Sequence, residues 1–138
     1  GSLAAYQAGL TLRKGLVNLD LGNTQWQRDL SISHEKIGDV LAAQGDGPGS
    51  LAAYQESLTI REGLAKGDPT NMQWQVDVAV SCAKLGSLDS LLSILQRREY
   101  LSRGLKLLTA LKQVGRLHAS QDWTGWFDNE LSSLKRIT

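Results

Sequence analysis

The sequence predicts an all-α fold of the solenoid kind, and three observations lead to it. Residues 2–40 and 50–88 are the same segment written twice, with a constant offset of 48 positions (50 − 2). Apolar residues recur at helical spacing along the chain, without the alternation that is typical of strands. Clusters of glycine and proline separate these periodic segments. A long fixed period is typical of solenoids, in which each unit buries its apolar face against the next.

The first three helices are expected within the duplicated segment. The first covers about residues 2–19, and the second begins after Asn23 or Thr24, because both residues are good N-caps. The second helix ends at the Gly- and Pro-rich turn that follows it. The third covers about residues 50–66, and Gly67-Asp68-Pro69 ends it because proline cannot continue a helix.

The apolar spacing in the second half of the chain predicts three further helices. One runs over about residues 70–95, up to a break at Gln96-Arg97, and the next continues to Gly115. The last covers about residues 120–136, with Ser120 as its N-cap and Asp122 at the positive end of the helix dipole. The apolar face of this last helix consists of Trp123, Trp126, Phe127, Leu131 and Leu134.

The repeat divides the 138 residues of one expected domain into units. These are a partial unit (1–22), a full unit (23–69), a degenerate unit (70–119) and a closing helix (120–138). Trp123 echoes Trp74 at an offset of 49, which fits a longer preceding loop. Because the chain starts within a repeat and its single methionine is Met72, we expect a piece of a longer protein.

Composition excludes several classes of protein. The formal net charge is +1 and no basic stripe is present, which argues against a nucleic-acid partner. No apolar run reaches the roughly 20 residues that cross a bilayer, so no membrane partner is expected. A single cysteine, Cys82, excludes an internal disulfide framework and favours a cytoplasmic protein.

The residues that most often carry chemistry predict no reaction. His34 and Cys82 occupy equivalent positions, 48 apart, on faces expected to fill the core, and His118 falls in a loop. No Cys or His pair has the spacing of a zinc site. We therefore expect neither metal nor cofactor, and no catalytic residue.

One stretch of the repeat resembles the tetratricopeptide repeat, a helix–turn–helix unit. The stretch reads Ile37-Gly38, Leu41, Gly45, Ser50, Tyr54 and Ser57-Leu58, at the spacing of that family. The next unit keeps Leu85-Gly86, but its Tyr100 comes two residues early. The longer period here is similar to that of arrays in bacterial multidomain proteins. The resemblance implies a right-handed α-solenoid that binds proteins or peptides.

The same resemblance implies where a ligand groove lies. Its lining positions fall at Ile32, Glu35, Asp39, Ala42, Ala83 and Ser87. The family's clamp for a C-terminal carboxylate needs Lys and Asn where this chain has Glu35 and Asp39, so that clamp is not present. The two acids are expected either to attract a cationic or amide-rich partner or to form an ordinary solvated face.

Two further sets of residues recur at the repeat period. Trp26 and Trp74 are expected to pack between neighbouring units. A polar trio repeats at i, i+4 and i+7, which places its members on one helix face. It consists of Asp29, Ser33 and Lys36 in one copy and of Asp77, Ser81 and Lys84 in the other. Hydrogen bonds between units and a polar stripe on a ligand groove both remain as interpretations.

The function that these observations favour is a non-catalytic scaffold module that binds a protein or peptide within a larger protein. The alternative is a structural spacer or self-association module. This alternative rests on the unpaired first helix, whose apolar face has no preceding helix to cover it.

Overall fold

The computed structural model of the chain describes residues 2–137. Every regular element in that range is a helix, so the all-α prediction is confirmed there. The chain divides into two compact units, and the division falls between Lys66 and Gly67 at the end of the third helix.

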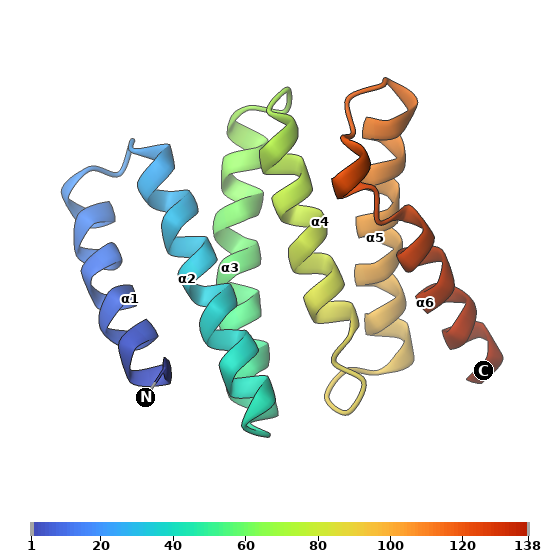
Figure 1. Cartoon of the computed structure of the whole chain (residues 1–138), viewed down its shortest axis with the longest axis horizontal. Helices are drawn as coiled ribbons and strands as arrows, with labels where there is room; N and C mark the ends of the chain where they lie inside the picture. Colours follow the sequence, from blue (N-terminus) through green and yellow to red (C-terminus); the bar gives the residue numbers. More distant parts are fainter. Residues whose placement is uncertain (1, 138) are drawn as a thin grey trace. The chain divides into compact units, whose positions relative to one another are not determined.

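The first unit consists of three helices. They are α1 (Ser2–Leu19), α2 (Thr24–Ala43) and α3 (Gly47–Gly67). Consecutive helices run in opposite directions, and α2 has α1 on one side and α3 on the other (Figure 1). The core side chains of this unit include Leu30 and Ile37 from α2 and Tyr54 and Leu58 from α3, each no more than 8% exposed.

Asparagine caps set the start of two helices at equivalent places in the repeat. The Asn23 side chain accepts a hydrogen bond from the backbone N–H of Trp26 at 3.0 Å, and Asn71 does the same for Trp74 at 3.0 Å. Of the two caps expected for the second helix, Asn23 is therefore the one that is used. Such caps satisfy backbone donors that have no partner within the helix.

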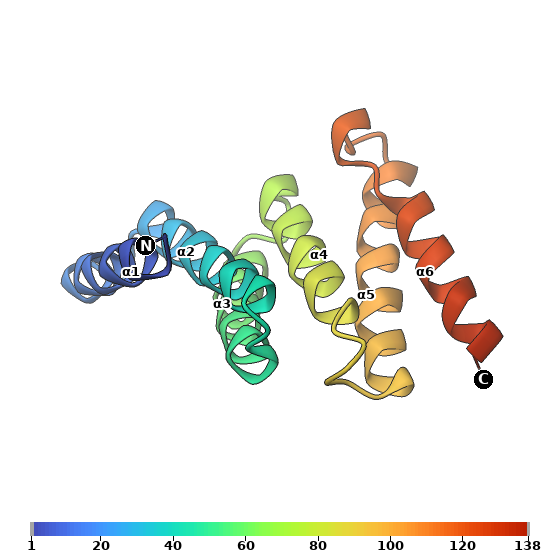
Figure 2. The same cartoon turned by 60° about the horizontal axis from the view of Figure 1, so that its bottom comes forward.

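The second unit contains three α-helices and one short 3₁₀ turn. They are α4 (Met72–Gly86), α5 (Ile94–Gln113), η1 (Ala119–Gln121) and α6 (Thr124–Ile137). Figure 2 shows α5 flanked by α4 and α6. The buried centre of this unit is apolar and consists of Val76, Ala79, Leu101, Leu108, Phe127 and Leu134.

The expected fourth helix is shorter than the sequence predicted. It ends at Gly86 instead of about residue 95, and α5 begins at Ile94. Ser93 caps α5 in a reciprocal capping box with Gln96. Between these two points the Ser87 hydroxyl donates to the Ala83 carbonyl, as short polar side chains do in turns, and the backbone N–H of Asp89 donates to the Ser87 carbonyl. The leucines in this stretch continue the apolar period, which is why the helix was extended too far.

The last helix also differs from the prediction. It begins at Thr124 instead of Ser120, since η1 and a turn occupy the preceding residues. Asp122 holds the start of α6 by accepting bonds from both the N–H and the hydroxyl of Thr124. Phe127 is fully buried, as expected, but Trp123 and Trp126 are 40% and 39% exposed. The apolar face expected for the last helix is therefore covered at Phe127 and Leu134 but left partly open at the two tryptophans.

The residues assigned to the core on the basis of the repeat are found there in most cases. His34 and Cys82 are 6% and 0% exposed, which confirms both as core residues. Trp26 and Trp74 are half-buried, so the prediction that they pack is confirmed only in part.

Candidate functional site

The predicted groove residues fall in both units. Ile32, Glu35, Asp39 and Ala42 lie on α2 in the first unit, and Ala83 lies on α4 in the second. Ser87 is the C-cap of α4, and its hydroxyl donates a 2.7 Å bond to the carbonyl of Ala83. Ala42 and Ser87 are exposed, and the others are half-buried. Whether any of them contacts a partner remains a prediction.

The expectation that Glu35 and Asp39 stand on an exposed face is wrong. The Glu35 carboxylate forms an ion pair with Arg61 at 2.9 Å, and its side chain is 14% exposed. The Asp39 carboxylate accepts a 2.6 Å hydrogen bond from the hydroxyl of Tyr54. Both acids therefore hold α3 against α2.

These two bonds belong to a polar seam between α2 and α3. Arg61 is 3% exposed and donates a second bond, from Nε, to the hydroxyl of Ser31 at 3.1 Å. The hydroxyl of Ser57 donates to the backbone carbonyl of Ser31 at 2.8 Å. We call this set, Ser31, Glu35, Asp39, Tyr54, Ser57 and Arg61, the polar seam. Buried polar groups of this kind are tolerated because each has a partner.

Close approach of the backbone brings the seam together. Gly38 faces the ring of Tyr54 so closely that a Cβ at Gly38 would lie 2.5 Å from Cε1. The hydroxyl of Ser50 bonds the Gly38 carbonyl at 2.9 Å. Glycine is therefore required at this point of α2, because any larger side chain would meet the Tyr54 ring.

Burial changes the titration of two side chains of the first unit. Burial and the hydrogen bond to Asp39 raise the pKa of the Tyr54 hydroxyl, so Tyr54 stays a donor. Burial and the nearby charge of Lys14 lower the pKa of His34 below 6.5. The His34 imidazole is therefore neutral inside the core at neutral pH.

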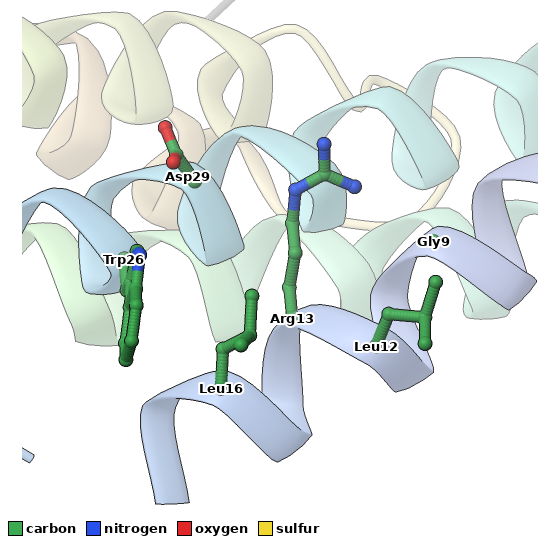
Figure 3. A pocket seen from close by; sticks show the side chains of 6 residues that line it. All are labelled: Gly9, Leu12, Arg13, Leu16, Trp26 and Asp29. Carbon is green, nitrogen blue, oxygen red and sulfur yellow. The ribbon is translucent and has the colours of Figure 1, made fainter. Parts of the chain in front are cut away.

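A pocket of about 300 Å³ opens between α1 and α2 on the other side of α2. Its lining residues are Gly9, Leu12, Arg13, Leu16, Trp26 and Asp29. Figure 3 shows Leu12, Arg13 and Leu16 on α1, with Trp26 and Asp29 beside them on α2. Leu12 is 72% exposed and Leu16 is 40% exposed. The pocket thus offers apolar walls with one guanidinium and one carboxylate.

The two charged residues of the pocket differ in whether they have a hydrogen-bond partner. Asp29 accepts a 2.9 Å bond from the side-chain amide of Gln25. Arg13 is exposed and has no hydrogen bond or ion pair to any residue between 2 and 137. Its guanidinium lies over Gly9, because a Cβ there would be 2.9 Å from Nη1. Arg13 is therefore the charge that this pocket presents to a ligand.

The second unit has a less distinctive hollow between α5 and α6. It measures about 370 Å³, and Lys106 is the charged residue among those that line it. Elsewhere in this unit Lys112 pairs with Asp122 at 2.8 Å and lowers the pKa of that carboxyl to about 2. This pair supports the start of α6 and does not face the hollow.

Of the six pocket residues, the sequence pattern pointed to Gly9, Leu16, Trp26 and Asp29 for packing or repeat reasons, and it gave no sign of Leu12 or Arg13. The signal was nevertheless in the repeat. Arg13 stands 48 positions before Arg61, so it is the copy of a buried arginine on a helix that lacks the corresponding cover.

Among residues 2–137 no group of three or more His, Cys, Asp and Glu side chains is placed to hold a metal ion. No helix in the described part of the chain has the length and hydropathy to cross a bilayer.

Comparison with known proteins adds no relative to this description. No family model matches the chain, and neither a curated protein nor a solved structure does.

Proposed function

We propose that this chain is a non-catalytic interaction module that binds a protein or peptide, and that the pocket between α1 and α2 is its binding surface. The observation that carries the proposal is the combination found there. Exposed leucines, a half-buried tryptophan and an arginine without a partner line one concave site. Sites that bind proteins commonly join an apolar centre with an arginine that the partner must satisfy.

The proposal extends to architecture. The duplicated segment and its tetratricopeptide-like residues favour a right-handed α-solenoid, in which such modules act as scaffolds within a larger protein. The bond network around Gly38 supports this part, because a glycine facing a large aromatic residue is what that family's spacing requires. The other predicted groove residues stay predicted contacts of their own units, Ile32 and Ala42 in the first unit and Ala83 and Ser87 in the second.

The proposal is tested with the full chain and a displayed library of amphipathic helical peptides. Ligands selected on the parent protein are measured again on the variant Leu12→Asp. We expect each of these ligands to bind the variant about tenfold more weakly or worse, a change of about 1.4 kcal/mol. The variant should keep its helical circular dichroism, since Leu12 is 72% exposed.

The matched control is Leu95→Asp, which places the same charge at an exposed leucine of α5. Leu95 is 61% exposed and lies in the other unit. Binding to this variant should equal binding to the parent. Selection of no ligand, or equal losses in the two variants, would contradict the proposed surface.

Self-association is the second candidate, and the uncovered α1 is the observation that favours it. Tyr6, Leu16 and Leu19 on this helix are 39%, 40% and 81% exposed. Sedimentation equilibrium of the full chain over a wide concentration range distinguishes the two candidates. A monomer at all concentrations excludes self-association, and a dimer lost in Leu12→Asp supports it.

A further inference from the structure

The α3 side of the polar seam has a copy elsewhere in the chain, on α1. Residues 2–19 repeat residues 50–67, so α1 carries the counterparts of the residues by which α3 contacts α2. Tyr6 stands at the place of Tyr54, Gly9 at that of Ser57 and Arg13 at that of Arg61. All three fall on one face of α1, because residues three and four apart share a face.

This face is covered on α3 and uncovered on α1. Tyr54 is 5% exposed and Arg61 is 3% exposed, whereas Tyr6 is 39% exposed and Arg13 is exposed. Tyr6, like Arg13, has no hydrogen-bond partner within residues 2–137. Gly9 and Arg13 also line the pocket, so the uncovered face and the pocket form one continuous surface.

We infer that the partner of this surface is an α-helix that presents the same face that α2 presents to α3. The inference rests on the proposed function and names the partner's chemistry. The helix carries a glycine opposite Tyr6, a carboxylate three residues before that glycine and a second carboxylate directly after it. In α2 these three residues are Gly38, Glu35 and Asp39.

The contacts within the first unit specify what each partner residue does. The earlier carboxylate pairs with Arg13, as Glu35 pairs with Arg61 at 2.9 Å. The later carboxylate accepts a bond from the Tyr6 hydroxyl, as Asp39 does from Tyr54 at 2.6 Å. The glycine admits the tyrosine ring, which a Cβ would exclude at 2.5 Å. Charge-assisted bonds from arginine to a carboxylate are among the strongest of these contacts.

A second copy of this chain is a poor occupant. Its own α2 face is already covered by α3 through the polar seam. The corresponding face of α4 has alanine at position 83 and serine at position 87 in place of the two acids, so it offers Arg13 no carboxylate. A separate helix with an acidic, glycine-containing face therefore suits the surface better.

The test uses a synthetic peptide of residues 22–46 of this chain as the probe and the full chain as its receptor. The peptide contains α2 with its cap, Asn23. Binding is measured by fluorescence anisotropy of a labelled peptide. We expect Arg13→Glu in the protein to weaken binding about tenfold or more. The peptide change Glu35→Arg should weaken binding to the parent protein and restore binding to the Arg13→Glu protein.

The matched control is Lys14→Glu, which reverses the same charge on the neighbouring residue of α1. Lys14 is exposed and is not among the residues that line the pocket. We expect it to weaken binding much less than Arg13→Glu does, because Lys14 lies outside the pocket and acts only through long-range attraction. A second peptide, with Gly38→Val, should bind poorly to every protein because its side chain meets Tyr6.

Each outcome separates this inference from the proposed function. If the probe fails to bind, or binds equally to the parent and Arg13→Glu, the inference about the partner helix is wrong. If library ligands still depend on Leu12 in that case, the surface binds partners of another pattern and the proposed function stands. If neither the probe nor any library ligand depends on this surface, both are wrong.

Discussion

The contact of α2 with α3 and the contact of α4 with α5 occupy the same place in the repeat but are built from opposite chemistry. The place that Arg61 holds in the polar seam is taken in the second contact by Leu108, whose side chain is completely buried. Ser31 and Glu35 become Ala79 and Ala83. At these positions the first helix pair is therefore joined by hydrogen bonds and an ion pair, and the second by apolar packing.

What the two contacts share is the closeness of the helices. Gly38 faces Tyr54, and Gly86 faces Leu101, where an added Cβ would lie 2.6 Å from Cδ2. In both contacts the carbonyl of the glycine accepts a side-chain bond, from Ser50 at 2.9 Å and from Arg97 at 2.9 Å. The comparison teaches that the repeat conserves backbone approach between its copies, while the surrounding side chains change from polar to apolar.

The largest effect is expected from breaking the polar seam on one side only. Arg61→Leu leaves Glu35 largely buried without its partner, and Ser31 loses a bond. Removing one partner of a buried ion pair costs about 3–5 kcal/mol. We expect the free energy of unfolding, measured by circular dichroism in urea, to fall by about that amount. A fall of less than about 1 kcal/mol would mean that Glu35 is stabilised by water instead.

Two further variants sharpen this result. Arg61→Leu combined with Ser31→Ala and Glu35→Ala gives the first contact the residues of the second. Because the triple variant leaves no buried charge without a partner, it should lose clearly less stability than Arg61→Leu alone. Arg13→Leu removes the exposed copy of the same arginine and should change stability by no more than about 0.5 kcal/mol.

A smaller effect is expected from filling the two close approaches. Gly38→Ala should cost about 1–3 kcal/mol, because the Tyr54 ring is held in place by its bond to Asp39 and cannot move aside. Gly86→Ala should cost less, since Leu101 has no polar bond to break when it shifts. The measurement is again urea unfolding. Equal losses in the two variants would show that the bond to Asp39 does not fix the Tyr54 ring. In that case adding Tyr54→Leu to Gly38→Ala should restore none of the lost free energy of unfolding.

The smallest effect concerns the pair His34 and Cys82, which also occupy equivalent places. Because burial lowers the pKa of folded His34, the unfolded chain takes up a proton first as the pH falls below about 6.5. The stability contributed by neutral His34 is therefore present above that pH and is lost below it. Urea unfolding at several pH values should show a steeper loss for the parent than for His34→Gln.

The control for this measurement is His118→Asn, because His118 is exposed and its Nδ1 accepts a bond that an asparagine oxygen can also accept. Its pH profile should match that of the parent. If the His34→Gln profile also matches, the neighbouring charge of Glu56, which raises the pKa of His34, offsets burial.

The helices could be predicted where a local signal marks their ends. Asn23 and the glycine–proline turns are such signals, and they place the first three helices closely. The ends of α4 and α6 were misplaced because the apolar period runs on through residues that the structure holds in turns. Tyr100 was misjudged because Leu101, not Tyr100, faces Gly86 as Tyr54 faces Gly38. The offset between these two facing residues is 47 (101 − 54), one less than the period of 48.

The candidate site could be predicted less well, because it depends on which copy of a face is covered. Arg13 and Arg61 are the same residue type in nearly the same local sequence. Their difference arises from the helix packed against α3, and no pattern within residues 2–19 encodes it. Glu35 and Asp39 were expected to be solvated for the same reason, since their partners lie 26 and 15 residues further along the chain.

The seating of α3 on α2 has a consequence for how copies of this chain meet in solution. Because α1 and α3 carry matching faces, both could bind the same face of α2. Within one molecule α3 occupies it, because the short connection to α2 gives α3 a high effective concentration. If α3 detached, α1 of one molecule would reach α2 of the next in a head-to-tail manner, and such contacts grow without closing. Loss of the ion pair between Arg61 and Glu35 is therefore expected to favour open-ended association of copies.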